Sequence, residues 1–269
     1  MLRTLMALLL AATVFAETAL LDGRKVHYST YGQGAQSVVL IHGWTCDESV
    51  WAANVAELAQ HFRVLTVDLP GHGQSEPAPS NSMETYADAV SAAMRDAKIK
   101  QAVLVGHSMG GAVILAFARR HPEQTTALVG VDAVFLDAAT AEKIKDPATR
   151  FEGPGGVAAR EKMIRSMFSV ATTKEVQDHI LKIMLAAPEK VAVGAMQAMW
   201  VPAFWRDDVI DLPMLEIAAA SNTYVTLESL KRRFPNAELQ HVEGTGHFLM
   251  MEWPAEFDRI LIHWVTALH

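Results

Sequence analysis

Cysteine is nearly absent from this sequence, whose 269 residues include only Cys46. One thiol excludes an intramolecular disulfide and a cysteine-rich metal site. Positive charge is also scarce, with 23 lysines and arginines against 30 aspartates and glutamates and a net charge of −7. A dedicated nucleic-acid-binding protein presents a basic surface, so this balance argues against nucleic acid as a partner.

Long hydrophobic runs are missing as well. The uncharged stretch Thr4–Phe15 has 12 residues, whereas a membrane-spanning helix needs about 20. It follows one positively charged residue and precedes the small residue Ala16, which is the order of an export signal. We therefore expect residues 1–16 to be a signal peptide, the mature chain to begin at Glu17, and the protein to be periplasmic or secreted without stable membrane insertion.

Motifs that bind metals, nucleotides or phosphate are missing too. The sequence has no His-Glu-x-x-His motif, no calcium-binding carboxylate loop and no P-loop. The glycines at positions 32, 34, 71 and 73 do not open a helix, as those of a dinucleotide-binding fingerprint do. No cofactor is therefore expected, and the expected partner is a small-molecule substrate. The oligomeric state stays open.

What is present is a pattern of alternating strands and helices from Val26 onward, which predicts a mostly parallel sheet covered by helices on both faces. The predicted strands are nearly all apolar, as strands buried on both faces must be. They are Ser37–Ile41, Arg63–Asp68, Ala102–Val105, Ala127–Val131, Met214–Ala220 and Glu238–Val242. The predicted helices between them are Ser49–Gln60, Thr85–Ala97, Gly110–Arg120, Leu227–Arg233 and Pro254–Ala267.

Residues 135–211 interrupt this alternation with three helical patterns, at Arg160–Phe168, Lys174–Leu185 and Val191–Trp200, and no strand pattern. Helices inserted between two strands are expected to form a cap over the carboxyl edge of the sheet, where such folds bind ligands. The predicted domains are a signal peptide (1–16), a core (17–134 and 212–269) and a cap (135–211). Most of the cap's large apolar side chains are expected to form its own core; they are Met163, Met167, Phe168, Met196, Met199, Trp200, Phe204 and Trp205.

The strongest chemical signal is the segment Gly106-His107-Ser108-Met109-Gly110-Gly111. A buried strand precedes it and a helix pattern follows it, which is the strand–turn–helix setting of a nucleophilic serine. The turn is tight, so Gly106 and Gly110 are expected to flank Ser108 because they are small. The amide of Met109, at the start of the helix, is positioned to face a developing oxyanion.

A serine hydroxyl is a weak nucleophile at neutral pH and needs a base within hydrogen-bonding reach. The best candidate is His247, in the segment Glu243-Gly244-Thr245-Gly246-His247-Phe248. This segment follows the last predicted strand, and its two glycines allow the loop to return over the edge of the sheet. His247 is therefore predicted to be the base.

A second donor for the oxyanion is predicted from the segment Leu40-Ile41-His42-Gly43-Trp44, which ends the first buried strand. In a sheet of this type the loop brings a backbone amide toward the serine. The amides of Trp44 and Met109 are expected to form a two-donor oxyanion hole.

Four segments resemble, in order, the signatures of the α/β-hydrolase superfamily. They are His42-Gly43-Trp44, Asp68-Leu69-Pro70-Gly71-His72-Gly73-Gln74-Ser75, Gly106-His107-Ser108-Met109-Gly110-Gly111, and Gly246-His247-Phe248 with Glu252 and Pro254. The resemblance implies an α/β-hydrolase fold with a helical cap inserted before the penultimate strand. It also implies Ser108 as nucleophile, His247 as base, and the amides of Trp44 and Met109 as the oxyanion hole.

The third member of the triad departs from the superfamily's usual pattern. Relatives carry an aspartate about nine residues past the proline before the penultimate strand, and here that position is Asn222. Asp132, at the end of the preceding strand, is one alternative, and Asn222 acting through its side-chain carbonyl is the other. We favour Asp132 because a serine needs more help from its base than a cysteine thiolate does.

The expected function is that of a serine hydrolase, a carboxylesterase that acts on small to medium uncharged esters through an acyl-enzyme on Ser108. The cap segment carries 10 basic and 11 acidic residues between Phe135 and Leu212, so no strong field selects a charged substrate. An amide- or C–C-cleaving hydrolase shares every motif and remains an alternative. A ligand-binding protein of this fold with weak turnover is another, because Asn222 stands where an acid is usual.

Overall fold

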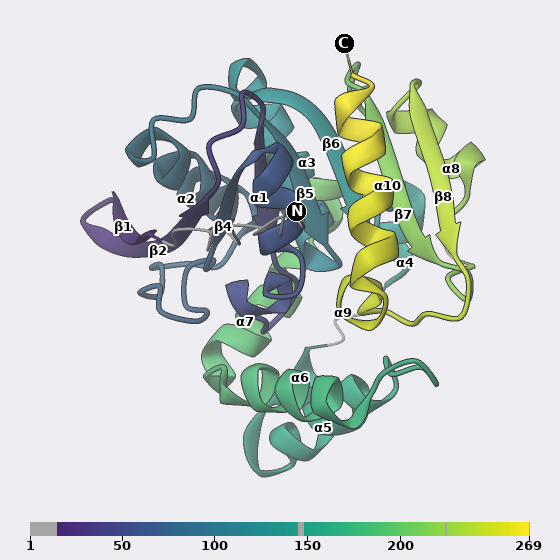
Figure 1. Cartoon of the computed structure of the whole chain (residues 1–269). Coiled ribbons are helices and arrows are strands. Elements are labelled where there is room, and N and C mark those ends of the chain that lie inside the picture. Colours follow the sequence, from purple (N-terminus) through teal and green to yellow (C-terminus); the bar gives the residue numbers. More distant parts are fainter. Residues whose placement is uncertain (1–14, 145–147, 224, 269) are drawn as a thin grey trace, which may run out of the picture.

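In the residues that the computed structural model describes, 15–144, 148–223 and 225–268, an eight-stranded sheet forms the centre of the molecule (Figure 1). Its order is β1-β2-β4-β3-β5-β6-β7-β8. The β1–β2 and β2–β4 pairs are antiparallel and all the others are parallel. The strands are β1 (Phe15–Leu21), β2 (Arg24–Tyr31), β3 (Ser37–Ile41), β4 (Arg63–Val67), β5 (Ala102–His107), β6 (Thr125–Val131), β7 (Met214–Ala219) and β8 (Ala237–Val242).

Helices cover both faces of this sheet. The helices α2 and α3 pack against each other on one face, and α1 and α10 pack together on the other (Figure 1). The helices are α1 (Val55–His61), α2 (Met83–Asp96), α3 (Met109–Arg120), α4 (Ala138–Lys143), α5 (Gly156–Arg165), α6 (Lys174–Ala186), α7 (Glu189–Met199), α8 (Leu227–Arg233), α9 (Leu249–Glu252) and α10 (Pro254–Thr266). The predicted doubly wound, mostly parallel sheet is confirmed. Of the helices in the described ranges, none has the length and apolar character needed to cross a bilayer.

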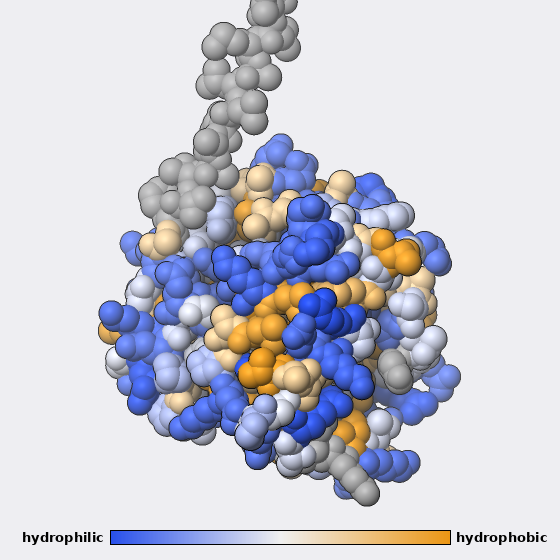
Figure 2. Space-filling view, turned by 90° about the horizontal axis from the view of Figure 1, so that it is seen from below, coloured by the Kyte–Doolittle hydropathy of each residue, from blue (hydrophilic) through white to orange (hydrophobic). Residues whose placement is uncertain are grey.

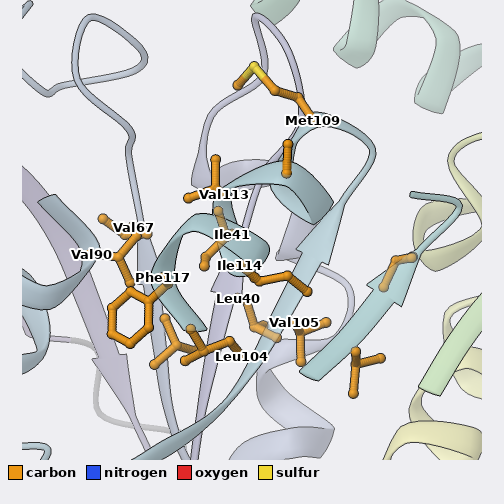
Figure 3. Close-up of a cluster of buried hydrophobic side chains, with 14 of the residues drawn as sticks. Leu40, Ile41, Val67, Val90, Leu104, Val105, Met109, Val113, Ile114 and Phe117 are labelled. Carbon is orange, nitrogen blue, oxygen red and sulfur yellow. The ribbon is translucent and has the colours of Figure 1, made fainter. Parts of the chain in front are cut away.

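The apolar core lies between the sheet and α3. Figure 3 shows side chains of β3 and β5 meeting side chains of α3, with Phe117 beside Val67 and Val90. Each of these side chains is fully buried. Burial of an aliphatic or aromatic side chain contributes about 1.5–3 kcal/mol to folding. This packing fixes the end of β5, from which Ser108 projects.

One strand and one helix differ from the sequence-based expectation. The strand β8 exposes Glu238 and His241, since it is an edge strand and not buried on both faces. The predicted helix Ser49–Gln60 is divided into a 3-10 turn, Glu48–Trp51, and α1. The chain bends before α1 because the side chain of Asn54 is anchored to α9 and α10.

The antiparallel hairpin of β1 and β2 was not predicted. It begins at Phe15, so it includes the last two residues of the predicted signal peptide, while residues 1–14 lie outside the described residues. In β1, the residues from Glu17 to Leu21 pair with the residues from Tyr28 to Arg24 of β2. The hydroxyl of Tyr28 also donates to the carboxylate of Glu17 at 3.1 Å. These contacts belong to the part of the strand that remains after the predicted cleavage.

The helices α4 to α7 lie between β6 and β7, the penultimate strand, so the predicted place of the cap insertion is confirmed. The helices α5 and α6 lie below the sheet in Figure 1. Figure 2 shows this lower face, where hydrophobic residues gather in the middle and hydrophilic residues border them. Of the eight cap side chains named from the sequence, four are buried, namely Met196, Met199, Phe204 and Trp205. The half-buried ones are Met163, Met167, Phe168 and Trp200.

Candidate active site

Ser108 occupies a strained turn between β5 and α3. Its backbone has φ +53° and ψ −116°, a conformation that costs of order 1–3 kcal/mol for a residue with a side chain. Its amide donates to the carbonyl of Val131 at 3.0 Å, which ties the turn to β6. A Cβ at Gly106 would lie 2.2 Å from the carbonyl oxygen of Gly110. The expectation that small residues must flank the serine is therefore confirmed.

The loop after β3 is held by His42. The amide of Leu69 donates to His42 Nε2 at 3.0 Å, so Nδ1 carries the proton and donates to the carbonyl of Gly43 at 2.8 Å. Burial lowers the pKa of His42 and keeps the ring neutral. The amide of Cys46 donates to the same carbonyl at 3.2 Å. Two donors therefore fix the direction of the peptide between Gly43 and Trp44.

This peptide lies beside the serine. A Cβ at Gly43 would come within 3.1 Å of Ser108 Cβ. A trans peptide points its N–H opposite to its carbonyl, so the amide of Trp44 faces away from His42. Across the described ranges, the amides of Trp44 and Met109 have no hydrogen-bond partner within the protein. Both predicted oxyanion-hole donors are thus left unused by the fold itself.

Asp132 and His247 meet at the carboxyl ends of β6 and β8. His247 Nδ1 lies 2.7 Å from Asp132 Oδ2. The other oxygen, Oδ1, accepts from the amide of Ala219 at 3.0 Å and from Asn222 Nδ2 at 2.9 Å. Burial opposes the charge on Asp132, but these bonds and the attraction of His247 hold the pKa of the carboxyl below its usual value. The carboxylate is therefore charged and fully hydrogen-bonded at neutral pH.

The two alternatives for the partner of His247 take different places. Asp132 contacts the ring, whereas Asn222 donates its side-chain amide to Asp132. Asn222 consequently lies behind the carboxylate and supports it. His247 Nδ1 is thus engaged by Asp132, and the side-chain amide of Asn222 by the other oxygen of the same carboxylate.

His107 links the serine turn to the histidine loop, a contact that sequence reasoning missed. His107 Nε2 lies 2.8 Å from the backbone carbonyl of His247, and the two rings have centroids 4.7 Å apart. Burial, helped by the nearby His247, lowers the pKa of His107 to about 3, so the ring is neutral. A carbonyl only accepts, so Nε2 is the donor. Among the described residues, Ser108 and His247 share no direct hydrogen bond.

Glu252 links the histidine loop to the cap. Its carboxylate accepts from the amide of Gly246 at 2.5 Å and from the hydroxyl of Thr172. The amide of His247 also donates to the cap carbonyl of Met167 at 3.4 Å. The sequence analysis named Glu252 together with the segment Gly246-His247-Phe248, but only the structure brings Thr172 to it. The cap thereby helps to fix the position of His247.

A cavity of about 1090 Å³ opens beside Asp132 and His247, between the sheet edge and the cap. Its titratable lining residues are Asp132, Glu243 and His247, and Ser108 is not part of its wall. Most of the remaining wall is apolar, and it includes Phe135, Leu136, Met167, Phe168, Trp200 and Val225. Of the eight cap side chains named from the sequence, Met167, Phe168 and Trp200 therefore face this cavity. Across the described ranges, no group of three His, Cys, Asp or Glu side chains is arranged to hold a metal ion.

Comparison with known proteins identifies related sequences and related folds. The sequence model of the alpha/beta hydrolase family matches residues 38–260. The pimeloyl-(acyl-carrier protein) methyl ester esterase of Proteus mirabilis is 36% identical over 107 residues, which are 40% of this chain and 40% of that relative. A dihydrolipoyllysine-residue acetyltransferase component of the acetoin cleaving system, from Cupriavidus necator, is 38% identical over 125 residues, 46% of this chain and 33% of that relative. The chain thus spans less than half the length of these curated relatives.

Solved structures share the fold over nearly the whole chain. A thermophilic esterase from Thermogutta terrifontis superposes with a TM-score of 0.79 at 24% identity, covering 96% of this chain and 100% of that one. An enol-lactonase from Burkholderia xenovorans gives a TM-score of 0.78 at 22% identity, covering 93% and 100%. At this identity the likeness is one of fold. Since the family model matches most of the sequence and these structures share its architecture, the protein belongs to the alpha/beta hydrolase family.

Proposed function

We propose that the protein is a serine hydrolase that cleaves small to medium uncharged carboxylic esters. The observation that carries this proposal is the 2.7 Å contact between Asp132 and His247, next to a serine held in a strained turn. Ser108 is the proposed nucleophile, His247 the base and Asp132 the residue that orients the base. The curated relative named as a methyl ester esterase supports ester cleavage as the reaction.

The reaction follows from the roles of these groups. Asp132 holds the proton of His247 on Nδ1, which leaves Nε2 as the base that takes the proton of Ser108 Oγ. The oxygen attacks the ester carbonyl, and the amides of Trp44 and Met109 stabilise the tetrahedral oxyanion. His247 then returns the proton to the departing alcohol, and an acyl group remains on Ser108. Water, activated by His247, releases the acid.

The missing hydrogen bond between Ser108 and His247 is compatible with this scheme, because such bonds are often long before substrate arrives and tighten in the complex. The base is held through its backbone by His107 and through its ring by Asp132. These two contacts restrict the ring while leaving Nε2 available.

The ester preference gives a first test. We expect kcat/KM for p-nitrophenyl esters to rise from acetate to medium chains, because each methylene buried in the apolar cavity contributes about 0.8 kcal/mol. It is expected to fall at palmitate, the longest acyl chain of the series. An acyl chain ending in a carboxylate should react at least about tenfold more slowly than its uncharged counterpart, since it approaches Asp132 and Glu243.

The measurement is a series of kcat/KM values, with p-nitrophenyl hexanoate paired against the p-nitrophenyl monoester of adipic acid as the matched control for charge. A maximum at palmitate, or equal turnover of the charged partner, contradicts the preference. No turnover of any ester contradicts the ester proposal and favours an amide- or C–C-cleaving hydrolase or a ligand-binding protein.

We also propose that the protein is exported. Expression in a bacterium should yield a periplasmic product that begins at Glu17, and Leu9→Lys, which places a charge in the apolar stretch, should keep the chain in the cytoplasm. The mature strand would retain its pairing from Glu17 onward and the contact of Glu17 with Tyr28. N-terminal sequencing of both fractions tests this. Soluble cytoplasmic protein that retains Met1 would reject export.

A further inference from the structure

Glu216 is a buried acid for which the proposed reaction has no role. It lies inside β7 and is paired with Gly130 of β6. Gly130 precedes Asp132 by two residues. The side chain of Glu216 is 0% exposed. An acid in a central strand is unusual because burying a charge is costly unless the charge is paired. The side-chain hydrogen bond of Glu216 goes to the segment that carries Asp132.

One oxygen of Glu216 holds the residue that follows Asp132. The amide of Ala133 donates to Glu216 Oε1 at 2.8 Å, and the amide of Asp132 donates to the carbonyl of Ile217 at 2.8 Å. The strand β7 therefore accepts hydrogen bonds from two successive amides of this turn, those of Asp132 and Ala133. Asp132 needs this support because its backbone has φ +43°, a left-handed conformation that is strained for a residue with a side chain.

The other oxygen of Glu216, Oε2, occupies the space beside Gly130 that a side chain at residue 130 would fill. A Cβ at residue 130 would lie 1.8 Å from Glu216 Oε2, so Gly130 and Glu216 are a complementary pair across the two strands. Oε2 is buried and has no hydrogen-bond partner among the described residues. A bare carboxylate in such a place would be severely destabilised, whereas a neutral carboxylic acid is tolerated.

Burial raises the pKa of Glu216 well above its usual range, and the negative charge of Asp132 raises it further. Both effects favour the neutral acid at Glu216 beside the charged Asp132. Its carbonyl oxygen accepts from Ala133 without adding a second negative charge next to the carboxylate that serves His247. A glutamine offers the same neutral carbonyl acceptor at the same reach.

We propose that Glu216 is a positioning residue that, with Gly130, locks the turn after β6 so that Asp132 meets Nδ1 of His247. This inference rests on the proposed function, because it assigns the turn a purpose in the triad. Glu216 itself touches neither substrate nor His247. It acts only through Ala133 and the backbone of Asp132.

The test compares Glu216→Leu, which removes the acceptor, with Glu216→Gln, which keeps it. We expect Glu216→Leu to lower kcat by about 10²-fold with KM little changed, the size of effect that a misplacement of about 1 Å produces. Glu216→Gln should stay within about threefold of the parent, since its side-chain carbonyl replaces the bond to Ala133. Leu215→Val, which removes a buried methylene from the opposite face of β7, is the matched control and should behave like the parent.

A second readout requires no turnover. The proton between His247 and Asp132 should give a low-field ¹H NMR signal that persists in the parent, Glu216→Gln and Leu215→Val, and that shifts or disappears in Glu216→Leu. If the parent hydrolyses no ester, the proposed function fails, but this signal still decides whether Glu216 positions Asp132. A parent-like kcat and signal in Glu216→Leu overturn the inference, and so does an equal loss in Glu216→Gln.

Gly130→Ala provides an independent variant if Glu216→Leu does not fold. It retains the acid but pushes it away from its place, so it should also weaken the low-field signal and lower kcat. If Glu216→Leu does fold, the losses in the double variant should not add, because both changes act on the same turn. A normal signal in a folded Gly130→Ala protein would contradict the inference.

Discussion

Ser108→Ala is expected to lower kcat for ester hydrolysis by about 10⁶-fold, the loss seen when a serine nucleophile is removed from a triad. The physical reason is that the turn presents one oxygen to the substrate and that alanine cannot form the acyl-enzyme. Covalent labelling by a fluorophosphonate should disappear together with turnover. The fold should persist, because Ser108 uses its amide, and not its side chain, to bond Val131.

A matched control is Ser80→Ala, which changes an exposed serine on the loop before α2. This variant should label and turn over like the parent, and both variants should unfold at the parent's temperature. Persistent labelling of Ser108→Ala would exclude Ser108 as the nucleophile. Loss of labelling through unfolding would be recognised by circular dichroism.

Asp132→Asn is expected to lower kcat by about 10⁴-fold and to leave substrate binding largely intact. The contacts of the carboxylate explain why. Ala219 and Asn222 both donate to Oδ1, so the carbonyl of an asparagine would stay on that side. Its amide nitrogen would then replace Oδ2 and donate to His247 Nδ1. The proton of the ring would move to Nε2, where it blocks proton transfer from Ser108.

Two variants of Asn222 separate the supporting role from the orienting one. Asn222→Ala removes one of the donors to Asp132 and should cost no more than about tenfold in kcat, or about 1.4 kcal/mol of barrier. Asn222→Asp should lower activity, because it brings a second negative charge against Asp132 Oδ1. If Asn222 oriented the base, Asn222→Asp would raise activity instead.

The measurement is kcat for the three variants on one ester, followed across pH. Parity between Asp132→Asn and the parent would defeat the assignment of Asp132. A loss of less than about tenfold in every variant would mean that His247 works without either partner.

Local sequence patterns determined most of the elements and the serine turn. The bounds of β3 and α8 agree with the predictions, and the strand before Gly106 and the helix after Ser108 follow from short-range periodicity. The turn itself is a local event, because Gly106 and Gly110 approach each other within five residues. Such features depend on residues close in the chain, so the sequence alone predicts them.

The local patterns did not predict which distant segments pair with each other. The hairpin of β1 and β2 joins the sheet through antiparallel pairing of β2 with β4, and no local signal specifies that partner. The exposed residues of β8 likewise follow from its position at the edge, which depends on the order of all the strands. A strand's surroundings are a property of the assembled sheet.

Which of the two candidate residues contacts His247 was decided by the tertiary structure as well. The sequence left Asp132 and Asn222 as alternatives because both follow strands that end at the same edge of the sheet. Parallel pairing of β6 with β7 brings them together. The directions of the side chains place Asp132 against the ring of His247 and place Asn222 against the carboxylate of Asp132. Glu216 gains its contact with Ala133 through the same pairing. Residue types and spacing named the candidates, but their distances depend on strand order and on the strained turns that only the packed sheet can hold in place.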